Sequence, residues 1–165
     1  MTTGEHRRAP GSTQPFLHIP VPWVFVLGYL IGIGLQLLAP AHAGSAQLPT
    51  VLPVAGAVLF VVGAGIAGWS LILFARARTT TVPGEPSKIL MTRGPYRFTR
   101  NPMYVGLVLA YLGEAGMLLQ IWPLVPLLFA VAYVNWFVIP VEERSLGQMF
   151  AERYSQYCAR VRRWI

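Results

Sequence analysis

Long runs of apolar residues without any charge constrain this chain more than any other feature of its sequence. The run from Leu52 to Ala75 has 24 residues, and the run from Val21 to Leu38 has 18. As helices, at about 1.5 Å per residue, they would measure roughly 36 and 27 Å, close to the roughly 30 Å hydrocarbon core of a membrane. We therefore expect both runs to be membrane-spanning helices.

Two more apolar runs follow in the second half of the sequence. Met103 to Leu119 contains a single acid, Glu114, and Trp122 to Val141 contains no charged residue. Because only Gln120 and Ile121 separate the two runs, we expect them to form a tight helical hairpin.

The composition favours a membrane protein over a soluble domain. Hydrophobic residues make up 55% of the chain and charged residues 12%, whereas about 25% of the residues in an average soluble domain are charged. For 165 residues we expect one domain, and we predict an all-α membrane protein. It would have a polar N-terminal arm over residues 1–20, four transmembrane helices within residues 21–141, and a C-terminal amphipathic cytoplasmic helix over residues 142–165.

The basic residues form three groups along the sequence. Two precede the first apolar run, six lie between the second and third runs, and five follow the fourth, which accounts for all 13. With four crossings these groups share one side of the membrane, and the positive-inside rule makes that side cytoplasmic. We therefore expect a multi-pass protein with both termini in the cytoplasm. We attribute the net charge of +7 to membrane orientation rather than to nucleic-acid binding.

Three short patterns have simple explanations. A GxGxxG sequence at residues 63–68 lies inside the second apolar run, where small residues favour close helix packing over dinucleotide binding. Cys158 is the single cysteine, which excludes an intrachain disulfide, and no metal-binding pattern is present. Residues 41–43 resemble a signal-peptide cleavage site. The apolar run before them is longer than the roughly 7–15 residues usual in signal peptides, so we expect the first helix to be retained.

Two polar segments flank the last two apolar runs. The first reads GPYRFTRNPMYVG over residues 94–106, and in it Asn101 suits a helix N-cap and Pro102 suits the first helical position. The second begins with Glu142 and Glu143 and reads EERSLGQMFAERYSQYCARVRRWI. Its apolar residues recur every three or four positions, which predicts an amphipathic helix on the membrane surface.

Together, these two segments resemble the integral-membrane methyltransferases related to isoprenylcysteine carboxyl methyltransferase, a family with which bacterial phospholipid N-methyltransferases share the pattern. The family form is approximately GPYRxxRHPxYxG, then a helical hairpin, then EExxLxxxFxxxYxxYxxRVPR. The likeness covers residues 94–165. Asn101 stands where the family often has histidine, which argues against an imidazole role, and Arg162 stands where it often has proline.

The resemblance implies S-adenosylmethionine as methyl donor, held on the cytoplasmic side between a motif loop (residues 76–102) and the C-terminal helix. It also implies a lipophilic acceptor that enters from the bilayer, with the carboxylate, hydroxyl or amine of a prenyl, sterol or acyl lipid all left open. The candidate catalytic residues are Arg100, Glu142 and Glu143. The cofactor-binding residues that it implies are Tyr96, Arg97, Arg100, Asn101, Pro102, Tyr104, Gly106, Glu142, Glu143, Tyr154, Tyr157 and Arg160.

The chemistry of these residues agrees with that cofactor. Arg97 or Arg100 can bind its carboxylate through a bidentate guanidinium. Adjacent helical residues point about 100° apart, so we expect Glu142 and Glu143 to differ in role, one binding the cofactor and the other an arginine of the motif loop. We favour Glu142, on the same helix face as Asn135, as the membrane-side partner and Glu143 as the cofactor or arginine ligand. Either glutamate could act as base for a hydroxyl or amine acceptor.

Alternatives stay open at this level. Glu114 is either a functional acid inside the membrane or a hydrated residue near its far surface. The architecture also fits a membrane sterol-type reductase that uses NADPH, or a small helical membrane subunit without a cofactor. Apolar lining suits several lipid chains equally, and the oligomeric state is not indicated.

Overall fold

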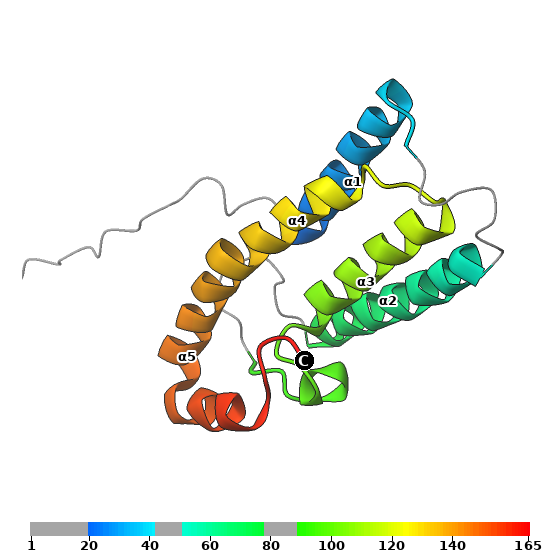
Figure 1. The fold of residues 1–165 in the computed structure, drawn as a ribbon. Coiled ribbons are helices and arrows are strands. Elements are labelled where there is room, and N and C mark those ends of the chain that lie inside the picture. The colour runs from blue at the N-terminus through cyan, green and yellow to red at the C-terminus, as the bar shows by residue number, and fades with distance from the viewer. Residues whose placement is uncertain (1–19, 42–50, 78–88) are drawn as a thin grey trace, which may run out of the picture.

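The structure, a computed structural model, describes residues 20–41, 51–77 and 89–165. Every regular element within these residues is helical, which confirms the all-α prediction (Figure 1). Residues 1–19 of the predicted polar arm and residues 78–88 of the predicted motif loop lie outside the described part. In chain order the elements are α1 (Val21–Leu38), α2 (Val51–Arg76), the 3-10 helix η2 (Gly94–Arg97), α3 (Pro102–Met117), α4 (Leu124–Tyr133), the π-helix η3 (Val134–Val138) and α5 (Ile139–Arg160).

Three helical stretches in the described residues are long and apolar enough to cross a membrane. They are α1, α2 and the continuous helical run from Leu124 to Arg160. The bounds of α1 and α2 agree with the predicted apolar runs to within one residue. α3 has only 16 residues, because it ends at Met117 and the chain then turns through Leu119 in the left-handed region (φ 54°). Length and composition therefore support three of the four predicted crossings.

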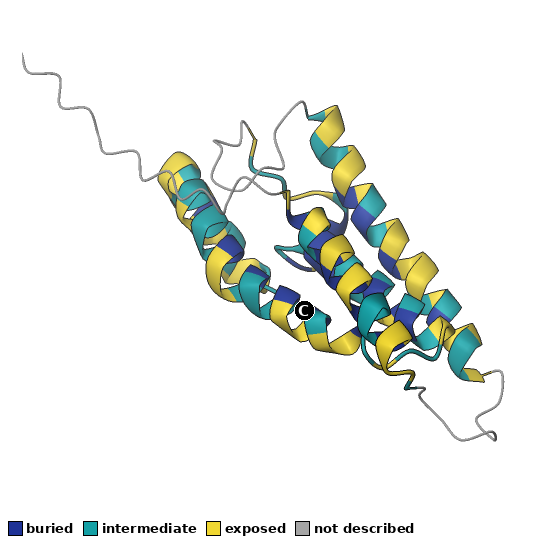
Figure 2. Ribbon diagram, turned by 90° about the horizontal axis from the view of Figure 1, so that it is seen from above, coloured by how far each residue is buried: buried dark blue, intermediate teal, exposed yellow. Residues whose placement is uncertain are grey.

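Exposed positions run along the outward faces of these helices (Figure 2), and many of them are large apolar residues. Leu30 in α1 is 57% exposed, Val61 in α2 is 67% exposed and Leu128 in α4 is 70% exposed. Water solvates such faces poorly, whereas lipid chains match them. The exposed faces and the helix lengths together indicate a protein embedded in a membrane.

The antiparallel helices α2 and α3 touch backbone to backbone. A Cβ atom added to Gly63 would collide with the backbone of α3 at Gly106, and one added to Gly56 would collide with it at Gly113. The two glycines of each helix are seven residues apart, which is about two helical turns, so the contacts lie along one face of each helix. We call this contact the glycine seam. The predicted role in helix packing is confirmed for Gly63, whereas a Cβ atom at Gly65 or Gly68 would meet nothing within 4 Å.

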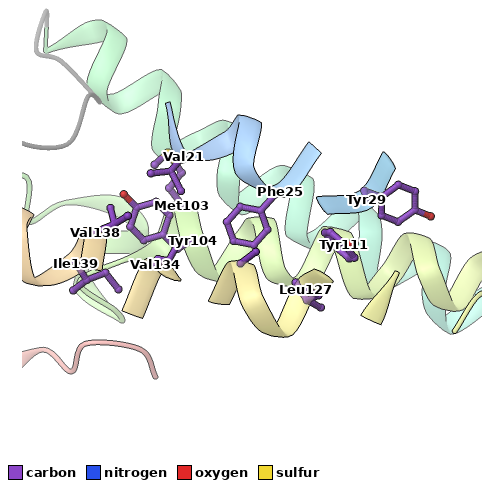
Figure 3. Packing of buried hydrophobic residues seen from close by; sticks show 11 residues of the cluster. Val21, Phe25, Tyr29, Met103, Tyr104, Tyr111, Leu127, Val134, Val138 and Ile139 are labelled. Carbon is purple, nitrogen blue, oxygen red and sulfur yellow. The ribbon is translucent and has the colours of Figure 1, made fainter. Parts of the chain in front are cut away.

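The buried core lies where α1 and α4 pack against α3 (Figure 3). Phe25 and Tyr29 of α1 and Tyr104 and Tyr111 of α3 are all at most 8% exposed. The rings of Tyr29 and Tyr111 meet edge to face with their centroids 4.9 Å apart. α4 packs mainly against α1 rather than α3. The predicted tight hairpin is therefore wrong in detail, because residues 118–123 connect α3 to α4 in place of a two-residue link.

The last helical run continues through the glutamate pair instead of starting there. Pro140 has no N–H with which to continue α-helical bonding, and the chain accommodates it with the π-helix η3. The backbone at Ala151 then leaves the helical region (φ 37°, ψ −110°) and turns the chain toward η2 (Figure 1). The helix predicted over residues 142–165 thus begins within α5 and ends at Arg160, since the residues after Arg160 are not helical.

Candidate active site

The two motif segments meet at one end of the helical bundle, where η2 lies beside the C-terminal part of the chain (Figure 1). η2 starts at Gly94, whose φ of 60° favours glycine. A Cβ atom at this position would lie 3.0 Å from Leu73 and 3.3 Å from Trp69 of α2. The two segments are joined through their backbones, because the Arg100 N–H donates to the Arg162 carbonyl at 2.9 Å.

Glu143 binds two arginines, one from each motif segment. Its Oε1 lies 3.1 Å from Arg100 Nη1, and its Oε2 lies 2.5 Å from Arg163 Nη2. Arg163 Nε also donates to Oε1 at 3.2 Å, which makes this second pairing bidentate. The side chains of Arg100 and Glu143 are only 17% and 20% exposed. This confirms the prediction that one of the two glutamates pairs with an arginine of the motif loop.

Arg100 is held as a cation within this cluster. Burial lowers the pKa of Arg100, but Glu143, Cys158 and Tyr154 together more than offset burial, so the pKa lies above its ordinary value. Its Nη1 also lies 2.7 Å from Cys158 Sγ and 3.5 Å from the Tyr154 hydroxyl. Its Nε is buried and has no hydrogen-bond partner among the described residues, which leaves one donor of Arg100 for a ligand.

Glu142 faces α3 instead. The Tyr104 hydroxyl donates to its Oε1 at 2.7 Å, and Tyr104 is 2% exposed. The helical spacing predicted that Asn135 shares a helix face with Glu142, but the two side chains have different partners. The Oδ1 atom of Asn135 accepts a hydrogen bond from Trp164 Nε1 at 3.0 Å. A π-turn takes in one residue more than an α-turn, so η3 changes the register between Asn135 and Glu142. The two glutamates therefore have different partners, as their helical positions predicted.

Two tyrosines join η2 to α5. The Tyr157 hydroxyl donates to the Tyr96 carbonyl at 2.7 Å. The Tyr96 ring is buried and packs edge to face on Phe74 of α2, with centroids 5.8 Å apart. Burial, and then the carboxylate of Glu142, raise the pKa of Tyr96 above its ordinary value. Its hydroxyl therefore stays protonated at physiological pH and can act as a hydrogen-bond donor.

The chain that follows α5 belongs to the site, although none of its residues was among the predicted site residues. The Arg163 carbonyl accepts hydrogen bonds from Asn101 Nδ2 at 2.9 Å and from Thr99 Oγ1 at 3.1 Å. Asn101 occupies the predicted N-cap position of α3, but its side chain makes no capping bond, because it binds Arg163 instead. The end of the second motif, which runs through residues 160–163, was a sequence signal that could have marked this segment.

Two cavities lie where the segments meet. The larger has a volume of about 520 Å³, and three arginines line it, Arg97, Arg153 and Arg160. The smaller has a volume of about 60 Å³ and is lined by both glutamates. Leu90 and Tyr157 line both cavities, so the two spaces adjoin. An arginine-rich space thus lies next to an acidic one.

Most of the residues singled out from the sequence line one of these cavities. Pro102 is the buried first residue of α3, and Tyr104 reaches the site through Glu142. The structure places Gly106 in the glycine seam, away from both cavities. Arg97 and Arg160 line the larger cavity, Tyr96, Arg100, Asn101, Glu142, Glu143 and Tyr154 line the smaller, and Tyr157 lines both.

Comparison with known proteins agrees with the motif resemblance. The chain is 32% identical over 110 residues to Protein-S-isoprenylcysteine O-methyltransferase A of Arabidopsis thaliana, which covers 64% of this chain and 55% of that protein. It is 30% identical over 110 residues to a Probable protein-S-isoprenylcysteine O-methyltransferase of Oryza sativa subsp. indica, with 64% and 56% covered. The chain therefore spans about half the length of these curated relatives. The profile of the family described as Phospholipid methyltransferase matches residues 51–153, and the chain belongs to that family.

Proposed function

We propose that the chain is an S-adenosylmethionine-dependent methyltransferase that acts on a lipophilic acceptor at the cytoplasmic surface of the membrane. The observation that supports this most directly is the pair of adjoining cavities, one lined by arginines and one by glutamates, at the meeting point of the two motif segments. Membership of a methyltransferase family supports the reaction class.

The larger cavity suits the cofactor in size and chemistry. Its volume of about 520 Å³ falls within the roughly 300–1,000 Å³ of small-molecule sites. Arg97, Arg153 and Arg160 would bind the carboxylate of the cofactor, Gln156 would hydrogen-bond to its ribose or adenine, and Tyr157 would lie against the adenine or the sulfonium. When bound, the cofactor supplies a methyl group on a positively charged sulfur.

The residues of the smaller cavity would orient the acceptor and exclude water. Holding the reacting groups in place supplies much of the rate in a one-step displacement. Glu142 lines this cavity and would accept a proton from a hydroxyl or amine acceptor. A carboxylate acceptor would need no base, and Glu142 would then act by positioning. Glu143 and Arg100 hold the motif loop in place through their ion pair.

We also propose that α3 crosses the membrane as a fourth span, with both termini cytoplasmic. α3 runs antiparallel to α2 along the glycine seam, so it returns the chain toward the side on which α2 begins. The segments that connect α1 to α2 and α3 to α4 contain no Lys or Arg, whereas all 13 lie before α1, from the last residue of α2 to the start of α3, or after Val141. The acceptor would enter sideways from the bilayer.

A comparison of ligands tests the cofactor. S-adenosylhomocysteine should raise the melting temperature of the full chain in detergent, and NADPH should not. Stabilisation by NADPH alone would favour a reductase, and stabilisation by neither ligand would favour a subunit without a cofactor. Either result would contradict the proposal.

Transfer of a labelled methyl group tests the acceptor. The names of the relatives suggest an isoprenylcysteine, and the family name suggests a phospholipid. Transfer to one of these should fall steeply as its chain is shortened, with about 0.8 kcal/mol per buried methylene as an upper guide. Equal turnover of a short, water-soluble analogue would contradict entry from the bilayer.

A further inference from the structure

A third cavity lies far from the two described above, toward the other end of α3. It has a volume of about 370 Å³ and reaches Glu114. Glu114 is 12 residues beyond Pro102, or roughly 18 Å along the helix axis. Leu30 and Phe60 at its wall are 57% and 37% exposed, so the cavity borders the lipid-facing surface. Its walls come from α1, α2 and α3 and include Leu30, Phe60, Ala110, Tyr29, Tyr111 and Glu114.

Glu114 has no ion-pair partner in residues 20–41, 51–77 and 89–165. The two segments that connect the helices at this end supply few cations for it. Residues 39–50 and 118–123 contain no Lys or Arg, and their one ionisable residue is His42. An unpaired carboxylate costs free energy in a membrane. The chain therefore brings an acid to this cavity without a permanent cation to balance it.

The two tyrosines beside Glu114 do not donate to it. The Tyr29 hydroxyl donates to Gln120 Oε1 at 3.3 Å. The Tyr111 hydroxyl is buried without a hydrogen-bond partner in the described part of the chain, and it lies beside Gly28 of α1. Neither tyrosine therefore satisfies the carboxylate of Glu114, which remains available to a ligand that donates hydrogen bonds.

We propose that this cavity binds a membrane amphiphile with an ammonium headgroup, which pairs with Glu114 while its hydrocarbon chain lies against α1, α2 and α3. The acid supplies the complementary charge, the apolar walls match a hydrocarbon chain, and the exposed rim admits it from the bilayer. The site is separate from both cavities at the motif segments, so it does not rest on the proposed function.

Two amphiphiles with the same chain test the role of charge. The full chain in a neutral maltoside detergent is titrated with hexadecylamine and with hexadecanol, and bound ligand is measured by native mass spectrometry. At about pH 8 an alkylamine is protonated and histidine is neutral, which removes His42 as a competing cation. The parent should bind the amine about tenfold more tightly, as expected for a charged hydrogen bond.

Matched variants separate the acid from the cavity. Glu114→Gln should abolish the preference for the amine, whereas Glu152→Gln, at an exposed acid of α5, should keep it.

Ala110→Phe would fill the cavity and should weaken the binding of both amphiphiles about tenfold. Leu128→Phe, on the lipid-facing surface of α4, should weaken neither. Butylamine should bind at least about tenfold more weakly than hexadecylamine, because it lacks the long chain.

Four outcomes would overturn the proposal. The first is equal binding of the amine and the alcohol by the parent, and the second is an amine preference that survives Glu114→Gln. The third is binding of butylamine as tight as that of hexadecylamine. The fourth is a dimer that binds neither amphiphile, which would assign the cavity to a second copy of the chain. Stabilisation by S-adenosylhomocysteine, measured on the same samples, should persist in Glu114→Gln. Failure of this site is therefore distinguishable from failure of the proposed function.

Discussion

Glu142 and Glu143 are neighbours in the sequence, yet they bind opposite sides of the candidate active site. Glu143 holds Arg100 and Arg163, and Glu142 accepts the hydroxyl of Tyr104. The angle of about 100° between adjacent helical residues makes this division possible. One acid thus joins the two motif segments, and the other faces Tyr104 of α3.

Replacing each glutamate by glutamine should separate these roles. Glu143→Gln removes the charge that two arginines share, so it should lower the free energy of unfolding by about 1–3 kcal/mol. Glu142→Gln should instead reduce methyl transfer to a hydroxyl or amine acceptor while leaving stabilisation by S-adenosylhomocysteine intact. Thermal denaturation in detergent, with and without S-adenosylhomocysteine, measures stability and cofactor binding, and transfer of a labelled methyl group measures activity. Glu152→Gln is the control, and a parental melting temperature for Glu143→Gln would show that its ion pairs contribute nothing to stability.

The arginines of the larger cavity should govern cofactor affinity. Arg97→Gln and Arg160→Gln each remove one cation from its lining, so each should weaken S-adenosylhomocysteine by about tenfold, the value of one charged hydrogen bond. Calorimetric titration measures the dissociation constant. Arg144→Gln, at an exposed position of α5 outside both cavities, should bind as the parent does. If all three variants bind alike, the cofactor lies elsewhere.

At the scale of helices, the glycine seam should tolerate no added carbon. Gly63→Ala places a Cβ atom against the backbone of α3, and overpacking of this kind costs about 1–3 kcal/mol. Gly65→Ala is a matched control two residues away, because a Cβ atom there meets nothing within 4 Å, and alanine favours the helix. Thermal unfolding in detergent compares them. Equal melting temperatures would contradict a close contact between α2 and α3.

The sequence predicted those elements that depend on composition and spacing. The 18-residue apolar run ends where α1 ends, because Pro40 has no N–H to continue the helix and disfavours a helical residue before it. α3 stops at Met117, before the predicted Leu119, because the turn after it depends on packing that no periodicity records. The π-helix η3 before Pro140 was not predicted either, because it adds one residue to a turn without any change in the apolar pattern. Helix existence was thus predictable, and helix ends were less so.

In the candidate active site, the contacts between charged side chains were predictable from the sequence, and the contacts to backbone atoms were not. Opposite charges in the two motif segments made the pairing of Glu143 with a motif arginine predictable. The bond from Asn101 to the Arg163 carbonyl was not, because every residue carries a backbone carbonyl. Gly106 was predicted to bind the cofactor because it lies in the motif. The structure places it in the glycine seam, a contact that depends on which helix packs beside α3.

At the scale of the whole molecule, the distribution of basic residues predicts the orientation. Cysteines introduced at Ser12 and Ser45, which lie outside the described residues, should react differently with an impermeant thiol reagent applied to intact cells. With Cys158 replaced by serine, Ser45→Cys should be labelled from outside and Ser12→Cys only after the membrane is opened. The reverse pattern would show that the termini lie outside the cytoplasm.

The glycine seam also bears on how fast a lipid acceptor could come and go. A contact made of backbone alone has no rotamers that can swing aside, so opening it requires α2 and α3 to separate. Side-chain rotations take picoseconds to nanoseconds, whereas movements of whole helices take microseconds or longer. Lipid exchange is therefore expected where α3 faces α5 and α1 through side chains such as Tyr104 and Leu107. Its pace would be set by the rotation of individual side chains.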